Sequence, residues 1–379
     1  MDPSAQFCPN PACPDKGQRD RTTIHIHSRK ERRYRCATCG KTFAATTGTA
    51  FYRLHHPPEV MVLVVTLLCH GCPLQAIVAA FGLDERTVTA WLQQAGAHCV
   101  RVHSALVQTE RVELGQVQAD EICVKVCRGR IWQAMALAIP SRLWLGGELS
   151  ATRDGALVTA LLRRVAACAA STALLVCVDG FSAYVGAVRT VFRVAVHTGR
   201  RGRPRLKLPA TVLLAQVVKS HQGRRLVDVT RRVVFGTEEA VTQAIARTRG
   251  GTQINTAYIE RLNATFRAAL APLTRRGRRL AHGTALLQSG MWLVGTVYNF
   301  CWAHESLRLR AIGGGHKWQE RTPAMAAGLT DHVWTVEEVL HYRVPPTEVA
   351  PPPRRSRPPN IISLARRRRA KARATEAVA

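Results

Sequence analysis

Acidic residues are scarce in this sequence, and it lacks both long apolar runs and a leader-like start. The 379 residues include 25 Asp and Glu against 54 Lys and Arg, so the formal net charge is +29. No uninterrupted apolar stretch reaches the roughly 20 residues that a membrane span needs. The opening residues, MDPSAQFCPN, lack the basic start and apolar core of a signal peptide. The sequence therefore predicts a cytosolic chain with no membrane-spanning segment.

The excess of positive charge favours a polyanionic partner. A chain this basic repels itself unless a polyanion neutralises it. Nucleic acid is the partner we expect, because Lys and Arg that neutralise phosphates release the bound counterions. A basic solvated surface, as on ribosomal or peripheral membrane proteins, is the alternative. With 46% hydrophobic residues, the chain can build two or three domains with apolar cores.

Residues 1–50 are predicted to fold around a metal ion, because they are rich in Cys, His, Arg and Gly and poor in apolar runs. In a reducing compartment cysteines act as metal ligands or core thiols rather than disulfides. Two closely spaced pairs can each form a tight turn that directs both thiolates to one point, and Gly40 supplies such a turn. Four thiolates make a closed structural Zn²⁺ site. The predicted ligands are Cys8, Cys13, Cys36 and Cys39.

The other cysteines are predicted to take no part in this site. His25 and His27 lie between the two pairs and are expected on the surface. Cys69 and Cys72 also have pair spacing, but they fall in a helical pattern with no second pair nearby, where core thiols are expected. The same expectation covers Cys123, Cys127, Cys168 and Cys177.

Residues 55–108 are predicted to form a helix-turn-helix domain. The segment CPLQAIVAAFGLDERTVTAWLQQAG contains a short helix, a turn and a second helix whose first N–H groups Asp84 can cap. The inward stripe of the second helix is Val88, Trp91, Leu92 and Ala95. A helix of this kind suits the major groove of DNA. The outward residues predicted to contact DNA are Arg86, Thr89 and Gln93. An ordinary helical hairpin would satisfy the same core pattern.

Residues 112–310 are predicted to form an α/β domain. The runs QVQADEICVKV, RIWQAMALAI and RLWLGGELSA indicate three successive strands. A helix over 155–167 follows, and then an apolar strand ending at Asp179. This order is the start of a ribonuclease H-like fold, in which helices cover a mixed central sheet.

The segment 198–250 is predicted to interrupt that domain as a basic β insertion. It holds 12 Lys and Arg and three acidic residues, a net charge of 12 − 3 = +9. Arg200, Arg201 and Arg203 are expected to lie along a phosphate backbone, and a solvated β-hairpin is the alternative. Residues 311–345 form a C-terminal extension, and the Pro- and Arg-rich tail 346–379 is expected to be disordered and attracted to DNA by its charge.

Three carboxylates stand on predicted elements of this domain: one within a strand, one at a strand end and one in the first turn of a helix. Asp120 shares a strand face with Ile122, Val124 and Val126, whereas Glu121 points to the opposite face. Asp179 lies at the carboxyl end of its strand, where open α/β sheets place their chemistry. Glu260 falls one turn into a helix that Asn255 or Thr256 could cap.

These carboxylates predict a site for two Mg²⁺ or Mn²⁺ ions. Hard oxygen ligands from a strand centre, a strand end and a helix suit such ions, which lie roughly 4 Å apart in two-metal phosphoryl transfer. The predicted ligands are Asp120, Asp179 and Glu260. Surface salt bridges are the alternative for each acid taken alone, and Asp154, Glu238 and Glu239 are the competing acids.

Several of these motifs together resemble a known family. RYRCATCGKTF with GTAFYRL, then ADE, VDGFSAY and INTAYIERLNATFR, resemble the bacterial insertion-sequence transposases. Those proteins have an N-terminal zinc ribbon, a helix-turn-helix and a DDE catalytic domain of the ribonuclease H-like fold. The likeness runs from about Cys8 to Arg310, and WQERTPAMAAGLTDHVWTVEEVL is similar to the tail of related transposases.

The resemblance implies roles for individual residues. The catalytic carboxylates would be Asp120 of ADE, Asp179 of VDG and Glu260 of IERxNxxxR. Further residues of the last motif would support the site or contact DNA; they are Arg261, Asn263 and Arg267. The second and third acids are 260 − 179 = 81 residues apart, farther than in compact members of the family, and the basic insertion accounts for the extra length.

The activity that the resemblance implies is metal-dependent cleavage of double-stranded DNA at transposon ends and joining of the 3′-hydroxyls to target DNA. We expect a homo-oligomer that bridges two ends in the bacterial cytoplasm, associated with the nucleoid. Two alternatives stay open: a domesticated DNA-binding regulator without catalysis, and a ribonuclease H-like nuclease without strand joining.

Overall fold

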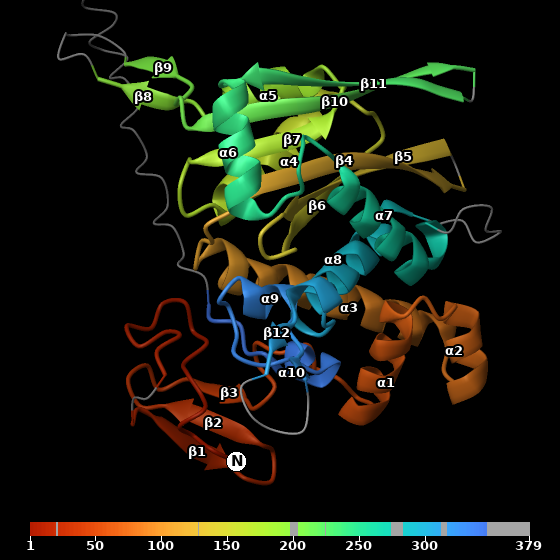
Figure 1. Ribbon diagram of the computed structural model, residues 1–379. Helices are drawn as coiled ribbons and strands as arrows, with labels where there is room; N and C mark the ends of the chain where they lie inside the picture. The colour runs from red at the N-terminus through yellow and green to blue at the C-terminus, as the bar shows by residue number, and fades with distance from the viewer. Residues whose placement is uncertain are drawn as a thin grey trace, which may run out of the picture. The chain divides into compact units, whose positions relative to one another are not determined.

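The computed structural model describes residues 1–19, 22–127, 129–197, 204–223, 225–273, 283–311 and 317–346 (Figure 1). They fall into two compact units, with Met1–Ala45 in one and Thr46–Val344 in the other. The predicted DNA contacts Arg200, Arg201 and Arg203, and the predicted tail beyond residue 346, lie outside the described residues. None of the described helices combines the length and the apolar character needed to cross a bilayer.

The N-terminal unit holds a small antiparallel sheet of order β1-β2-β3. The strands are β1 (Ile24–Ser28), β2 (Arg33–Cys36) and β3 (Thr42–Ala44). Tyr34 and Phe43 are cross-strand partners whose rings stack with centroids 5.8 Å apart, and both are buried with Ile24. The rest of this small core consists of buried cysteines, so the sheet has few other apolar side chains to hold it.

Three helices open the larger unit at the predicted positions. They are α1 (Pro58–Cys69), α2 (Leu74–Phe81) and α3 (Glu85–His103), and a π-helical turn, Ser104–Gln108, extends the last. Gly82 ends α2 with a positive φ of 62°, and Asp84 caps α3 by accepting a 2.8 Å bond from the N–H of Arg86. Of the predicted inward stripe, Val88, Trp91 and Ala95 are buried and Leu92 is half-buried.

Helix α3 is longer than a recognition helix needs to be, and it packs along α8 (Thr284–Phe300). Gly96 lies at the point of closest approach, where a Cβ would be 2.6 Å from the backbone of Ser289. The predicted helix-turn-helix is therefore joined to the rest of Thr46–Val344 through a shared apolar core.

The centre of this unit is a six-stranded mixed sheet of order β11-β10-β7-β4-β5-β6. Strands β4, β5 and β6 are antiparallel neighbours, β7 runs parallel to β4, and β10 runs parallel to β7. The prediction of three strands, a helix and a further strand is confirmed, and so is the mixed α/β class. The bounds are β4 (Gly115–Val126), β5 (Gly129–Ala138), β6 (Trp144–Ser150), β7 (Leu174–Asp179), β10 (Val212–Gln222) and β11 (Arg225–Phe235).

Helices cover both faces of the sheet (Figure 1). The residues of β7 alternate between two cores: Val176 and Val178 pack in the main core, while Leu175 and Cys177 pack in the core formed with α6. The main core also holds the apolar sides of α4 and α5. The bounds are α4 (Gly155–Cys168), α5 (Ala183–Val191), α6 (Glu238–Thr248) and α7 (Ala257–Ala269).

The segment predicted as an insertion contributes a strand to the sheet itself. In β10, Val212 and Leu214 are buried in the main core because the first half of the strand, Val212 to Val217, pairs with β7. This basic β segment is thus part of the central sheet, in which β11 pairs with β10 as the outer strand. Two short strands, β8 (Val194–Val196) and β9 (Arg205–Lys207), pair separately.

The C-terminal elements complete the larger unit. Gly295 in α8 allows the ring of Trp144 to approach closely, since a Cβ there would be 2.3 Å from that ring. His98 Nε2 lies 3.0 Å from the carbonyl oxygen of Val339, which ties the last helix to α3. The bounds are β12 (Leu309–Arg310), β13 (Trp318–Gln319), α9 (Pro323–Ala326) and α10 (Val336–His341).

Two of the thiols predicted in cores are exposed instead. Cys168 and Cys177 are buried as predicted, but Cys123 and Cys127 are exposed. Pairing of β4 with β7 ends at Gln118, so the later residues of β4 run beyond the neighbouring strand. Cys123 then alternates to the open side of β4, opposite to the buried residues Ile122 and Val124.

Candidate metal centres

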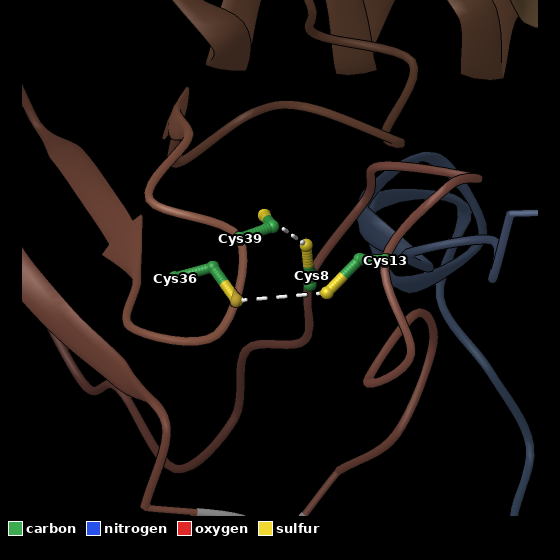
Figure 2. A group of neighbouring side chains, drawn as sticks. All are labelled: Cys8, Cys13, Cys36 and Cys39. Carbon is green, nitrogen blue, oxygen red and sulfur yellow. Dashed lines mark hydrogen bonds between the residues drawn. The ribbon is translucent and has the colours of Figure 1, made fainter.

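The four predicted zinc ligands come together in the N-terminal unit (Figure 2). Cys8 Sγ lies 3.6 Å from Cys39 Sγ, and Cys13 Sγ lies 3.9 Å from Cys36 Sγ. Sulfurs bound tetrahedrally at about 2.3 Å from one ion would be about 3.8 Å apart. The cluster therefore has the composition and the dimensions of a structural zinc site, and it could hold that ion.

Backbone turns place these thiols. Gly40 has a positive φ of 68°, which closes the turn so that its N–H donates to the carbonyl of Cys36 at 2.9 Å. On the other side, the N–H of Gly17 donates to the carbonyl of Cys8 at 3.1 Å. His25 and His27 are exposed on β1, as predicted, and belong to no described metal-binding group.

One thiol of the cluster ionises readily. Burial opposes ionisation of Cys39, but hydrogen bonds from the backbone of Lys41 and the side chain of Asn10 outweigh it and lower the pKa of this thiol to about 7. The thiolate is the form that binds metal, so Cys39 is the thiol most ready to bind, whereas burial raises the pKa of the Cys8 and Cys13 thiols.

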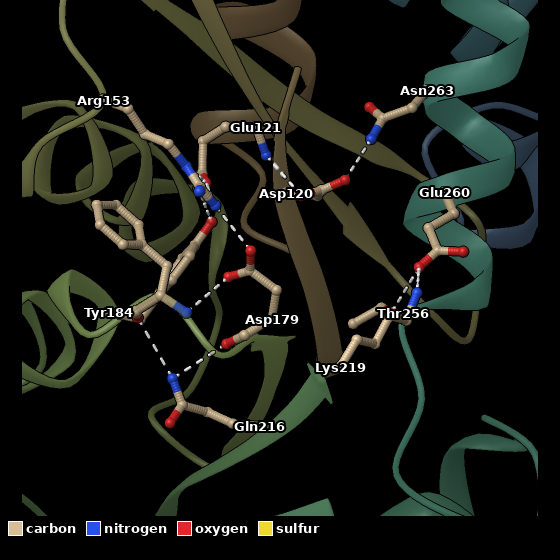
Figure 3. A network of polar contacts seen from close by, with 11 residues as sticks. Asp120, Glu121, Arg153, Asp179, Tyr184, Gln216, Lys219, Thr256, Glu260 and Asn263 are labelled. Atoms are coloured by element: carbon tan, nitrogen blue, oxygen red, sulfur yellow. Dashed lines mark hydrogen bonds and ion pairs between the residues drawn. The ribbon is translucent and has the colours of Figure 1, made fainter. Parts of the chain in front are cut away.

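The second centre lies at the carboxyl end of β7, beside the middle of β4 (Figure 3). The parallel pairing continues to Gln118 opposite Cys177, so Asp120 and Asp179, each two residues farther on, leave the sheet from the same face. Carboxylate oxygens of these two residues and of Glu121 all lie within 4.8 Å of one another. Oxygens that share one Mg²⁺ ion are up to about 4.2 Å apart. The group could therefore hold a metal ion after small side-chain movements.

Glu121 is the member of this group that the sequence pattern did not single out. It points to the opposite face of β4 from Asp120, as predicted, but it is only 7% exposed and lies under α5. Tyr184, in α5, donates a hydrogen bond to Glu121 Oε1. Burial raises the pKa of Glu121, and the bonds from Tyr184 and Arg153 oppose that rise.

Arg153 joins two of the carboxylates. Its Nη2 lies 2.9 Å from Glu121 Oε2 and 2.7 Å from Asp179 Oδ2. A guanidinium offers several N–H donors in a rigid plane, so it can neutralise both carboxylates at once. The backbone N–H of Phe181 adds a 3.0 Å bond to Asp179 Oδ1.

Among the described residues, no cation pairs with Asp120. It accepts a 2.8 Å bond from the side-chain amide of Asn263 and a 2.9 Å bond from the N–H of Glu121. Burial, followed by the negative charges of Glu121 and then Asp179, raises the pKa of Asp120 to about 7. An acid of this kind is stabilised in its ionised form by a bound cation.

A buried glutamine sets helix α7 beside this centre. Gln118, two residues before Asp120, accepts 3.0 Å bonds from the backbone N–H groups of Tyr258 and Ile259. Its own amide donates to the carbonyl of Asn255 at 2.8 Å. The first turn of α7 is therefore capped by the strand that carries Asp120, in addition to the predicted cap by Asn255, which accepts from Ala257 at 3.2 Å.

Glu260 lies near the group but outside it. Its Oε1 accepts a 2.6 Å ion-pair bond from Lys219 and a 3.0 Å bond from Thr256 (Figure 3). Its negative charge is one of the causes that raise the pKa of Asp120, and it is one turn from Asn263, which contacts Asp120. The structure thus brings Asp120 and Asp179 together with Glu121, and leaves Glu260 paired with a lysine on β10.

The remaining predicted residues take distinct positions. Arg261 is exposed and Arg267 is half-buried on α7, while Arg86 and Gln93 are exposed and Thr89 is half-buried on α3. The competing acids have local roles: Asp154 caps α4 through the N–H groups of Ala156 and Leu157, and Glu238 and Glu239 occupy the first turn of α6.

Sequence patterns missed the cations and the buried acid because their roles arise only across segments. Arg153 follows β6 and Lys219 is on β10, so neither shares a local motif with the carboxylates. Tyr184 closes the VDGFSAY motif that begins beside Asp179, and Glu121 is a second acid next to Asp120, so these two residues were signals available in the sequence.

The chain was also compared with known proteins. No protein-family model matches it, and no curated protein matches it.

Proposed function

We propose that this protein is a DDE transposase that cuts transposon-end DNA and joins the 3′-hydroxyl ends to target DNA. The observation that carries the proposal is the placement of Asp120 and Asp179 on one sheet face, with their oxygens within 4.8 Å of a third carboxylate. Helix α7 adds Asn263 and Glu260 beside them.

The order of the strands supports a ribonuclease H-like catalytic domain. Three antiparallel strands, β6-β5-β4, continue into the parallel strands β7 and β10, and helices cover both faces. In such a sheet the first acid lies within the central strand and the second at the end of its parallel neighbour, as Asp120 and Asp179 do.

The chain's own residues can hold and orient two divalent ions. Asp120 and Asp179 supply oxygens from the sheet, and Glu260 is the proposed third ligand once Lys219 releases it. Asn263 keeps Asp120 turned toward the site. Bound Mg²⁺ or Mn²⁺ would activate a water or a 3′-hydroxyl and stabilise the leaving oxygen during attack on phosphorus.

The DNA-binding surfaces in this proposal are the zinc ribbon, the helix α3 and the arginines of α7. The net charge of +29 supplies the attraction to phosphates. Arg86 is exposed in the first turn of α3 and Gln93 about two turns later, on a helix that can enter the major groove. We propose a homo-oligomer in the bacterial cytoplasm, because two transposon ends must be held together.

The test is metal-dependent cleavage of the DNA that borders the coding sequence, followed by joining of a labelled pre-cut end to a plasmid. Asp120→Asn should lower both rates about a thousandfold, and Asp228→Asn, on the exposed strand β11, should leave them unchanged. Full activity in Asp120→Asn would show that the catalytic assignment is wrong. Cleavage without joining would identify a nuclease instead.

One observation favours a second function, that of a DNA-binding regulator without catalysis. Arg153 and Lys219 already neutralise Asp179, Glu121 and Glu260, so these acids are satisfied without metal. A regulator would bind the bordering DNA with equal affinity in EDTA and in Mg²⁺, and would cut it in neither.

A further inference from the structure

A shallow cavity, wide open to solvent, lies between α4 and α5, next to the acidic centre. Its volume is about 560 Å³. Arg153 belongs to both places, since it lines the cavity and also bonds to Asp179. Phe181 lines it too, and its backbone N–H bonds to Asp179. A group seated in the cavity would therefore lie beside any phosphate bound at the carboxylates.

One wall of the cavity is a stacking surface. The ring of Phe181 is half-buried, and the guanidinium carbon of Arg153 lies 4.4 Å from its centroid. The ring of Trp132 lies near the same guanidinium, with 5.4 Å between that carbon and the ring centroid. Aromatic rings and guanidinium planes are the side chains on which unpaired bases stack.

The other walls are small and hydroxylated. Gly155 and Gly186 line the cavity, and a Cβ at either position would meet no atom within 4 Å. Ser182 and Thr190 line it as well and are exposed. The Ser182 hydroxyl can donate to or accept from the polar edge of a planar ring, whereas the Thr190 hydroxyl donates to the carbonyl of Gly186 at 2.8 Å and can only accept. The site thus combines one flat face with polar groups around open space.

The charge of the cavity argues for a neutral group rather than a phosphate. The N-terminus of α4 would attract an anion, but Asp154 already accepts from its N–H groups at Ala156 and Leu157. The carboxylate of Asp154 also lines the cavity and would repel a phosphate. The positive charge of Arg153 is taken up by Glu121 and Asp179.

We propose that this cavity binds the unpaired base of the nucleotide next to the reacting phosphate, stacked on the ring of Phe181, whose contact with Arg153 links it to the acidic centre. The inference rests on the proposed function and adds a specific contact to it. The base belongs either to the cut strand or to the target strand, which present the same chemistry.

The test fills the cavity without disturbing the fold. Gly186→Leu directs a side chain into the open space and replaces a helical glycine by a better helix former, so the thermal midpoint should not fall. Ala156→Leu, exposed on α4 and outside the cavity lining, is the matched control. The probe is a duplex from the DNA bordering the coding sequence, with a single abasic site moved along each strand, measured in Ca²⁺ to prevent cleavage.

In the wild type, one abasic position should weaken binding about tenfold, the usual scale for losing one stacked base. Gly186→Leu should bind the intact duplex about tenfold more weakly, and the abasic site should then cost nothing further. Phe181→Ala should likewise make binding insensitive to the abasic site. Joining assays with the abasic site in the plasmid target or in the end duplex distinguish the two strands.

The inference is wrong if Gly186→Leu and Ala156→Leu both retain the wild-type abasic profile while the wild type cuts and joins DNA. A wild type that neither binds nor cuts the duplex would overturn the proposed function, and this inference with it.

Discussion

The two candidate metal centres differ in how their ligands are arranged before any ion arrives. The thiols of the cysteine cluster already have sulfur separations of 3.6 and 3.9 Å, and no described cation pairs with them. In the acidic centre, Arg153 bridges two carboxylates and Lys219 holds Glu260. The first arrangement is that of a permanent structural site, and the second is that of a site whose ligands exchange partners.

This contrast has a physical basis. Residues 1–45 have little apolar core, so a metal ion there can supply the folding free energy. The sheet around the acids is held by an extensive apolar core and needs no ion to fold. Burial instead destabilises the ionised form of its carboxylates. Arg153 and Lys219 offset this for three of the acids, and Asp120 responds with a raised pKa that favours its protonated form.

The largest effect is expected from removing a zinc ligand. Cys36→Ser should abolish bound zinc and the protease resistance of residues 1–45, because structural zinc contributes about 10–16 kcal/mol in small modules. Zinc per chain by mass spectrometry and limited proteolysis measure this. His25→Ser, exposed on β1, is the control and should keep its zinc. A Cys36→Ser protein that keeps its full zinc content would show that the cysteine cluster is not the structural zinc site.

The next effect concerns the pH dependence of the metal-free acidic centre. The pKa of Asp120 is raised from 3.8 to about 7, so the native state keeps a proton that the unfolded chain has released. Stability should therefore fall as pH rises from about 4 to 7, by at most about 4 kcal/mol. Asp120→Asn should be more stable than the wild type at pH 8 in EDTA and equal to it near pH 4, in chemical denaturation. If the variant and the wild type were equally stable at both pH values, burial would not disfavour the ionised form of Asp120.

A smaller effect should follow from freeing Glu260. Lys219→Met should raise Mn²⁺ affinity about two- to fivefold, because the ion no longer competes with a half-exposed ion pair worth up to about 1 kcal/mol. Lys207→Met removes the same charge from β9 and is the matched control. Isothermal titration without DNA measures both. An unchanged affinity in Lys219→Met would mean that Glu260 is no ligand, which sharpens the choice between Glu260 and Glu121.

The smallest effect should come from the hydrogen bond that Tyr184 donates to Glu121. Tyr184→Phe should lower the free energy of unfolding by about 1–2 kcal/mol, since a buried charged acceptor loses one donor but keeps Arg153. Tyr52→Phe, at an exposed ring, should change nothing. Zinc content should be identical in both variants, and a loss of zinc in Tyr184→Phe would show that the centres are coupled.

Much of the fold followed from local patterns. Strand-like runs located β4 and β5, a continuous apolar run located β7, and the spacing of two cysteine pairs located the thiol cluster. Asp84 marked the start of α3 because a capping side chain acts within its own turn. The helix that carries Glu260 was found in the same way.

Other features could not be found locally. A basic segment with strand-like runs reads the same whether it projects as a hairpin or joins a sheet, and only pairing with β7 places β10 in the core. Cys123 has the same strand pattern as a core residue, but its exposure depends on how far the neighbouring strand extends.

The sequence alone determined which chemistry is present: four thiols in two pairs, three acids within a strand, at a strand end and in a helix, and a strong excess of positive charge. The tertiary structure decided which of these groups meet. It brought Glu121 close to Asp120 and Asp179 and paired Glu260 with Lys219. It also placed a cavity beside Arg153. The reason is that strand register and helix packing bring together side chains from distant segments, and neither is encoded in any one motif.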